Sequence, residues 1–309
     1  MDEMDLAAPF ARMLAASCPP ATVRAIERGA DYAGVWAEID ASGFLDALVP
    51  ESAGGAGLSL SEVAPLVQAA ARQALPLPVG DTIVARWLFA TCGKTAPRAP
   101  IRAASSRAAL GAGTTIEAAD LGLFESEGAL FLTPLDAKTD RAASSLVGPA
   151  PAGGLRPLVA LMRAAAIAGA AGALLEATVR YANERVQFGR PIGKQQAIQQ
   201  QLALMAEHCV AARVATEIGF ASPLPPTIEA VATAKAMTSA AAPLIAATAH
   251  AVHGAIGISE ECDIQLLTRR LHYWRGSEGS ESYWDERLGQ ARLADTAPSV
   301  HWLSGAVGR

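Results

Sequence analysis

A short turn near the middle of the chain gathers the residues best suited to chemistry. Arg185, Gln187, Arg190 and Lys194 lie close together there, with Phe188 among them, between two stretches of helical spacing. Arginine and glutamine side chains donate hydrogen bonds to anions, and a guanidinium can bind a phosphate through two parallel bonds. The pattern indicates either an anion-binding turn with an aromatic plate or an ordinary helix hairpin with a basic turn.

A second polar stretch lies near the C-terminus, where Glu278-Gly279-Ser280 is followed by Glu281 and Ser282. A carboxylate enclosed beside an apolar chain has a raised pKa, which suits it to proton abstraction. Solvated loop carboxylates are nevertheless the commonest kind. The residues leave open whether Glu278, Glu281 or neither is a base.

A third stretch, His253-Gly254-Ala-Ile-Gly257, ends a long helical pattern with a glycine C-cap. Histidine at a helix end is more often structural than a base or a ligand.

Helices must position these residues, because 51 % of the chain is hydrophobic and only 5 % is aromatic. This composition favours close-packed helices over a β-sandwich. We predict an N-terminal helical domain over residues 1–95 and a C-terminal helical bundle over residues 154–309. Between them, residues 96–153 are rich in proline and small residues, which predicts either a small β-region or a flexible insert. The strands expected there span residues 108–114, 121–125 and 129–133, the last two joined as a hairpin at Gly128.

Composition also argues against several classes of function. A net charge of −5 gives no general reason to bind nucleic acid or an anionic membrane. Cys18, Cys92, Cys209 and Cys262 form no C-x-x-C pair, so we expect no metal site and reduced thiols. The acidic N-terminus does not resemble a signal peptide. The apolar run 164–175 is too short to span a bilayer. We therefore expect a cytoplasmic protein.

The sequences of these stretches closely resemble motifs of the acyl-CoA dehydrogenase family. Its signature is similar to Arg185-Val-Gln-Phe-Gly-Arg-Pro-Ile-Gly193 followed by Gln-Gln-Ala-Ile. A glycine-rich loop, Pro50-Glu-Ser-Ala-Gly-Gly-Ala-Gly57, resembles one in the family's N-terminal helical domain, and Glu278-Gly-Ser matches its Glu-Gly-Thr loop. The resemblance implies a mainly α fold with a C-terminal four-helix bundle. It also shows a departure, because full-length members carry a longer middle β-domain.

The resemblance implies FAD as the cofactor, bound across a subunit interface. Its predicted contacts are Arg185, Gln187, Phe188, Gln196, His253, Gly254, Gly257, Ser280 and Ser282. It also implies that Glu278 takes the α-proton of an acyl-CoA thioester while hydride leaves the β-carbon. Ala251 and Ala255 replace residues that relatives often have near the flavin.

Flavin-dependent α,β-dehydrogenation of an acyl-CoA is thus the leading hypothesis, in lipid or steroid catabolism. We expect a homo- or hetero-oligomer, such as a dimer of dimers, and an electron acceptor such as an electron-transfer flavoprotein. The first alternative is a non-catalytic or FAD-sharing structural subunit of a heteromer. The others are a helical scaffold that has lost flavin and a flavin oxidase or monooxygenase on the same fold.

Overall fold

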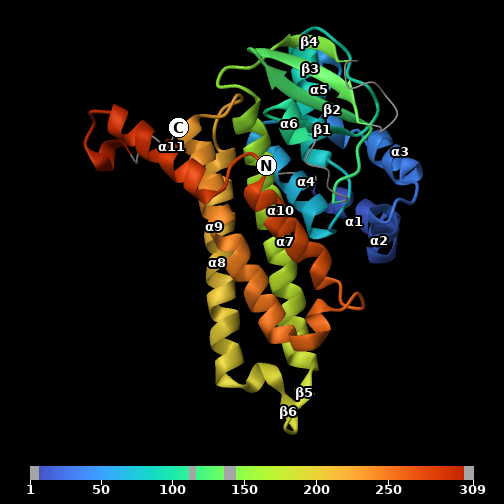
Figure 1. Ribbon diagram of the computed structural model, residues 1–309, viewed down its shortest axis with the longest axis vertical. Coiled ribbons are helices and arrows are strands. Elements are labelled where there is room, and N and C mark those ends of the chain that lie inside the picture. The colour runs from blue at the N-terminus through green and yellow to red at the C-terminus, as the bar shows by residue number, and fades with distance from the viewer. Residues whose placement is uncertain (1–6, 111–115, 136–143, 303–309) are drawn as a thin grey trace, which may run out of the picture.

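The computed structural model describes residues 7–110, 116–135 and 144–302. The chain is mainly α-helical, with a small sheet at one end of a long bundle (Figure 1). The predicted fold class is confirmed: N-terminal helices, a reduced β-region and a C-terminal helical bundle follow one another. The predicted boundaries fall in the connections between α5 and β1 and between β4 and α7. As domain limits they stay a prediction.

The N-terminal part consists of short helices that pack on the upper half of the bundle. They are α1 (Ala7–Ser17), α2 (Pro20–Glu27), α3 (Ala33–Ala41), α4 (Leu60–Arg72) and α5 (Val79–Thr91), with the 3-10 turns η1 (Phe44–Asp46) and η2 (Glu51–Ala53). Helix α4 begins with a capping box, in which Ser59 and Glu62 satisfy each other's backbone N–H groups. Helix α5 is buried over most of its length, so it serves as the core of this part.

The β-region is a four-stranded sheet in the order β1-β2-β3-β4. Its strands are β1 (Ile101–Ala104), β2 (Leu121–Ser126), β3 (Ala129–Pro134) and β4 (Ser145–Pro149). The predicted hairpin is confirmed, with Gly128 at φ 74° between β2 and β3. The predicted strand over residues 108–114 is wrong where it is described, because Arg107–Leu110 forms the short helix α6 and Leu110 buries its side chain under the sheet. Residues 111–114 lie outside the described ranges.

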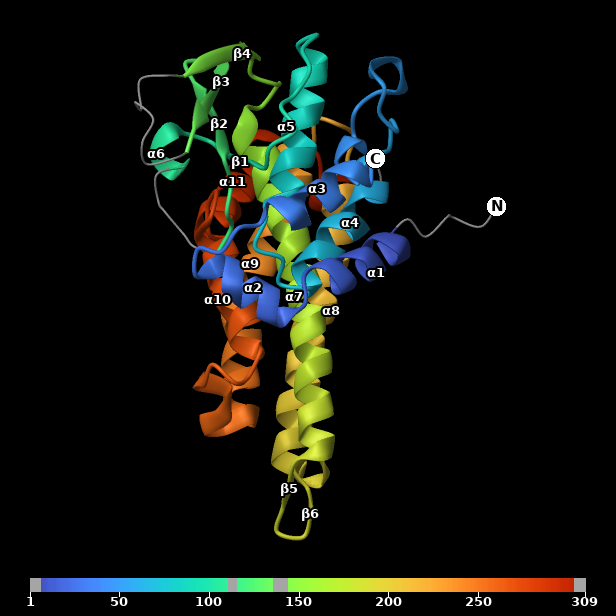
Figure 2. The same ribbon diagram turned by 90° about the vertical axis from the view of Figure 1, so that its right-hand side faces the viewer.

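The C-terminal bundle holds the longest helices of the chain. They are α7 (Leu155–Glu184), α8 (Gln196–Phe220), α9 (Ile228–His253), α10 (Ile264–Gly276) and α11 (Glu281–Ala294). Between α7 and α8 lie the two-stranded hairpin of β5 (Val186–Gln187) and β6 (Arg190–Pro191) and the turn η3 (Ile192–Lys194), while η4 (Gly254–Ile258) follows α9. Figure 2 shows this hairpin projecting at the end of the bundle opposite the sheet.

Helix α7 is the centre of the molecule. All of its first seventeen residues except Arg156 are buried, so this part of the helix is enclosed on every side. Both α7 and α9 are long and apolar enough, by length and composition, to cross a membrane. In α7, however, 78 % of the apolar segment is buried inside the protein. Close packing explains why the core needs small residues. A Cβ added at Gly169 would lie 2.4 Å from the backbone oxygen of Gln68 in α4.

Replacing Gly169 with alanine should therefore separate α4 from α7. We expect Gly169→Ala to lower the free energy of unfolding by about 1–3 kcal/mol, as overpacking of a core does. Urea denaturation followed by circular dichroism measures the change. Gly289→Ala is the matched control, because Gly289 is a helical glycine in α11 with open space around its Cβ position. That control should stabilise the protein by about 0.5–1 kcal/mol. Equal effects at the two sites would contradict the packing described here.

Candidate functional site

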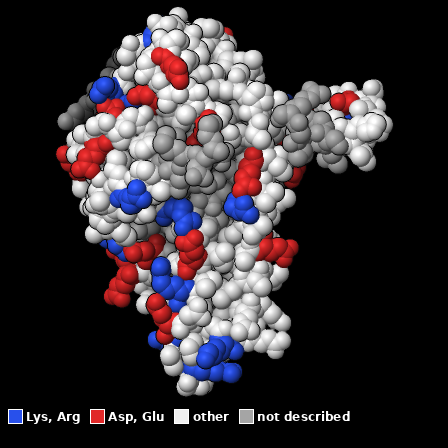
Figure 3. All heavy atoms as spheres, turned by 180° about the vertical axis from the view of Figure 1, so that it is seen from behind, with Lys and Arg blue, Asp and Glu red and all other residues white. Residues whose placement is uncertain are grey.

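The predicted anion-binding turn forms the exposed tip of the β5–β6 hairpin. Phe188 has a left-handed backbone (φ 53°) and is 93 % exposed, so its ring projects into solvent. Within the described part of the chain, no carboxylate pairs with Arg185, Arg190 or Lys194, and Figure 3 shows Lys and Arg gathered at this end of the molecule. The tip thus offers unpaired positive charge and an aromatic face to another molecule.

The His253 stretch lies at the same end of the bundle. The His253 ring is buried, stacks on Tyr181 with ring centroids 4.3 Å apart, and bonds through Nδ1 to the carbonyl of Ala249. Burial lowers the pKa of His253, so the ring is neutral at pH 7. These contacts give His253 a packing role. The neighbouring Gly254 is exposed, as is Gln196 at the start of α8, while Gly257 is buried. Their contact with a cofactor stays a prediction.

Glu278 lies at the other end, in the loop between α10 and α11. It is 8 % exposed, and its Oε1 accepts a hydrogen bond of 3.1 Å from the backbone N–H of Ser105. Its Oε2 lies 3.9 Å from Nε of Arg156 and has no hydrogen-bond partner. Of the two predicted serines, Ser280 is half-buried and Ser282 is exposed. The structure therefore brings Glu278 to the β-region and to the start of α7.

The other acid of this loop is already engaged. Glu281 pairs with Arg275, whose Nε lies 3.0 Å from Glu281 Oε2, and this hydrogen bond lowers the pKa of Glu281. An acid with a lowered pKa is a weaker base than a free one, which leaves Glu278 as the better candidate of the two.

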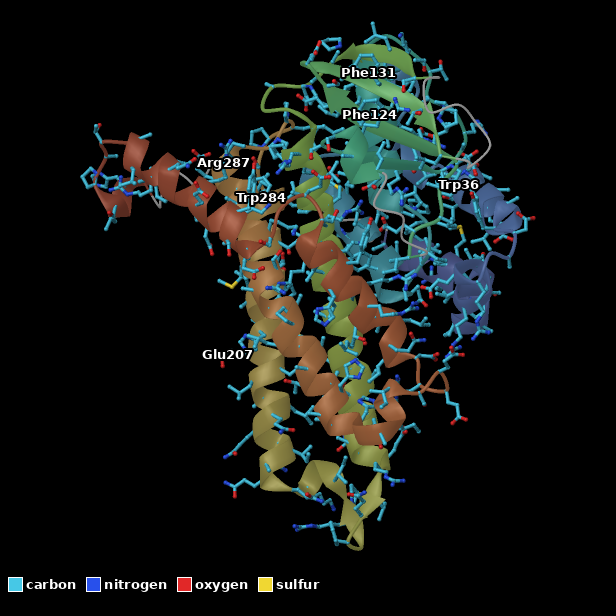
Figure 4. The ribbon with its side chains drawn as sticks, in the orientation of Figure 1. Trp36, Phe124, Phe131, Glu207, Trp284 and Arg287 are labelled. Carbon is cyan, nitrogen blue, oxygen red and sulfur yellow. The ribbon has the colours of Figure 1, made fainter. Side chains whose placement is uncertain are left out.

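A pocket of about 380 Å³ lies beside Glu278, between the β2–β3 turn and the helices α7 and α11. Three of its lining residues touch Glu278: Ser105, Arg156 and Trp284, whose indole N–H donates to the Glu278 carbonyl. Figure 4 shows Trp284 and Arg287 at this junction. Much of the lining is polar or charged, which favours a polar ligand over an aliphatic chain.

A buried ionic cluster fills the space beneath the Glu278 loop. Arg163 of α7 donates to Asp81 of α5 at 2.7 Å and to Glu117 at 3.2 Å, and Trp274 of α10 donates to Glu117 at 2.9 Å. Burial, opposed by the charge of Arg163, raises the pKa of Asp81 to about 6. The cavity beside this cluster measures only about 20 Å³, which is room for a single water molecule. An acyl chain does not fit there.

The sequence alone did not predict three of the residues that make these contacts, namely Ser105, Arg156 and Arg163. Arg156 and Ser105 showed no motif, because only the fold brings residues so far apart in the chain together. A signal did exist for Arg163, since it is a basic residue within a long apolar helical stretch. Such residues are rarely buried without a partner.

Helix α7 separates the two groups of predicted site residues. Arg156, beside Glu278, lies at its start, and Arg185 follows its last residue. At 1.5 Å per residue, these positions are roughly 45 Å apart along the helix. One chain therefore cannot place its hairpin tip and Glu278 against the same part of one small ligand.

Breaking the buried cluster should cost much more than breaking a surface ion pair. We expect Arg163→Met to lower the free energy of unfolding by about 3–5 kcal/mol, because Asp81 and Glu117 lose their shared cation. Arg213→Met, which removes an exposed ion pair with Glu217, should cost less than about 1 kcal/mol. Urea titration of both variants checks this. Similar costs would show that the cluster contributes no more than a surface pair.

Comparison with known proteins agrees with this geometry. Residues 159–291 match the family model described as acyl-CoA dehydrogenase, C-terminal domain. The chain is 31 % identical to acyl-CoA dehydrogenase IpdE2 of Mycobacterium tuberculosis, over 85 % of this chain and 88 % of that protein. It is 28 % identical to acyl-CoA dehydrogenase IpdE2 of Mycolicibacterium smegmatis, over 73 % and 76 %.

Solved structures show the same fold. The ChsE4–ChsE5 complex of Mycobacterium tuberculosis matches with a TM-score of 0.77 and 22 % identity, covering 96 % of this chain and 99 % of that one. The Tcur3481–Tcur3483 steroid ACAD G363A variant matches with a TM-score of 0.78 and 23 % identity, covering 94 % and 97 %. With these relatives and the motifs above, the chain belongs to the acyl-CoA dehydrogenase family, whose members are FAD-dependent oxidoreductases.

Proposed function

We propose that this chain is a subunit of an acyl-CoA dehydrogenase that desaturates a thioester between Cα and Cβ, and that it shares FAD with another chain. One observation carries the proposal: the hairpin tip and the Glu278 loop lie at opposite ends of α7. A dinucleotide is far shorter than this helix. Each end must therefore serve a different cofactor molecule, or only one end serves a cofactor.

The hairpin tip fits the adenosine diphosphate half of FAD. Arg185, Gln187 and Arg190 supply donors suited to a pyrophosphate, and the exposed ring of Phe188 supplies a surface for stacking. No partner within the described chain satisfies this tip, and an aromatic ring this exposed is unusual on a free surface. These features support a role completed by a second chain.

The Glu278 end fits the flavin ring and an acyl chain less well. Two groups of this chain already contact the carboxylate, namely the Ser105 N–H and Arg156. The ionic cluster of Asp81, Glu117 and Arg163 occupies the space below the loop. These contacts favour the FAD-sharing subunit, with the acyl group held in a partner chain. In the assembled enzyme, a carboxylate of the partner chain would take the α-proton, and bound FAD would supply the hydride-accepting chemistry.

A second candidate keeps catalysis in this chain, with Glu278 as the base. It is favoured by Oε2 of Glu278, which has no hydrogen-bond partner and is free to accept a proton, and by the adjoining pocket of about 380 Å³. In this case Arg156 would have to leave the carboxylate when substrate enters. Ser280 and Ser282 would then lie near the reacting groups.

Exposed apolar residues on α8 and α9 support an oligomer. They are Leu204, Val210, Val214, Met237 and Leu244. Exposed apolar side chains on neighbouring helices are candidates for a protein interface. A heteromer fits best, because the hairpin tip of this chain is exposed and unpaired, whereas internal ion pairs occupy the space around Glu278. An electron-transfer flavoprotein is the proposed acceptor. The steroid enzyme among the fold neighbours makes a polycyclic acyl-CoA the first substrate to test.

Changing the hairpin tip should weaken FAD binding without unfolding the protein. We expect Phe188→Ala to reduce FAD affinity about tenfold or more, since loss of a stacked aromatic costs about 1–3 kcal/mol per base. The assembled enzyme would come from co-expression with the products of neighbouring genes, and FAD retained after gel filtration would be quantified by absorbance. Leu146→Ala on β4 is the control, because Leu146 is another exposed apolar side chain and lies away from the tip, and this variant should retain FAD. Undiminished FAD in Phe188→Ala would remove the tip from the cofactor site.

Glu278→Gln separates the two candidate functions. If the base lies in the partner chain, kcat/KM of the assembled enzyme with an acyl-CoA panel should stay within about threefold of wild type. A general base contributes about 10²–10⁴-fold, so a fall of that size would assign the base to Glu278. Glu51→Gln, at the exposed turn η2, is the control. Rapid reoxidation of the reduced flavin by oxygen would instead favour an oxidase or monooxygenase, and protein without flavin would favour a scaffold.

A further inference from the structure

The loop that carries Glu278 has an unusual backbone. Glu278 has φ 58° and Gly279 has φ 102°. A Cβ at Gly279 would lie 2.6 Å from Cδ1 of Tyr283 and 2.9 Å from Nε1 of Trp284. Residues other than glycine rarely occupy the left-handed region and stay there only where the surrounding structure holds them. Some contact must therefore fix the Glu278 backbone.

Lys235 of α9 makes the contacts that span this loop. Its side chain is completely buried, and Nζ donates to the carbonyl of Arg275 at 2.8 Å and to that of Gly279 at 2.7 Å. The third bond, of 2.8 Å, goes to Oγ of Ser239 one turn later in α9. Arg275 belongs to the last turn of α10, and Gly279 lies two residues before α11. One ammonium thus ties both ends of the loop to α9, with every N–H group used.

Two further contacts each hold one residue of the loop. Trp284 Nε1 donates to the carbonyl of Glu278 at 3.1 Å, and Arg163 Nε donates to Oγ of Ser277 at 3.3 Å. Neither contact joins the entry of the loop to its exit. The side chains of Arg275 and Glu281 also pair across the loop, and Ser239 Oγ donates to the Arg275 carbonyl at 3.4 Å. Lys235 differs from these in binding backbone carbonyls on both sides of the loop and tying them to α9.

Charged groups from several elements face Lys235. Arg163 of α7 and Arg275 of α10 disfavour its charged form, whereas Glu281 of α11 and Glu278 of the loop favour it. Burial is the largest influence and lowers the pKa of Lys235 to about 7. Burying an ammonium group is unfavourable unless hydrogen-bond acceptors replace the lost water. For Lys235 these acceptors are two backbone carbonyls and one hydroxyl.

We propose that Lys235 is a positioning residue, which holds Glu278 in its left-handed conformation by tying the carbonyls of Arg275 and Gly279 to α9. It acts through the backbone of the loop and touches no reacting group. This role goes beyond the proposed function, because it concerns the conformation of the loop whether or not Glu278 is the base.

Lys235→Met tests the proposal in the assembled enzyme, because methionine keeps much of the length of the side chain and lacks the N–H groups. We expect hydrogen exchange of the amides in residues 277–281 to speed up at least about tenfold, two hydrogen bonds to the loop being lost. Exchange in α7 and α8 should change much less, since the lost hydrogen bonds lie at the loop and local opening exposes only the nearby amides. Lys94→Met is the control, as the ammonium of Lys94 also donates to a backbone carbonyl, that of Leu146.

Chemical rescue distinguishes positioning from general stability. In Lys235→Ala, added propylammonium should restore the protection of residues 277–281, while propanol should not. Wild-type protection in Lys235→Met, equal loss of protection throughout the bundle, or no effect of propylammonium would each overturn the proposal. If neither Lys235 variant folds, Ser239→Ala removes one acceptor and should give the same local pattern at smaller size; unchanged exchange in that variant would overturn the proposal as well.

Discussion

Close packing around α7 is the constraint on which the rest of the structure depends. Gly169 of α7 lets the backbone of α4 come into contact with that of α7. Gly219 of α8 lies where a Cβ would meet Ala234 of α9. Residues this small bury little area each, so the core gains its stability from the close approach of many backbones. The same packing makes α7 a rigid spacer with the Glu278 loop at one end and the hairpin tip at the other.

The two ends of α7 have different chemistry because they have different neighbours. The hairpin extends beyond the other helices, so its charges and the Phe188 ring remain in solvent. The loop end is covered by the small sheet, by α5 and by α11, so its charges must pair with one another. Arg163 pairs with Asp81 and Glu117, Arg275 pairs with Glu281, and Arg156 lies beside Glu278. A site already filled by internal pairs is poorly suited to an acyl chain, and an exposed, unpaired tip is well suited to a partner.

Several features of the fold could be predicted from local sequence. Helical spacing predicted the long helices on either side of the Arg185–Gly193 turn, and Gly128 predicted the turn of the β2–β3 hairpin. Each of these depends on residues near one another in the chain. The strand expected at residues 108–114 failed over its described part because a small-residue run has no strong preference, and Leu110 is buried better from a helical turn. Strand β1 was missed for a similar reason, since its pairing with β2 joins residues twenty apart.

By itself, the sequence determined the family, the mainly α fold and which residue types stand at the hairpin tip and in the Glu278 loop. These follow from motifs and periodicity, which are local properties. Only the tertiary structure decided that the two groups lie roughly 45 Å apart along α7. It also decided that Ser105 and Arg156 meet Glu278, and that Lys235 ties the loop to α9. The physical reason is that burial and pairing of charges depend on neighbours from distant parts of the chain, which periodicity does not specify.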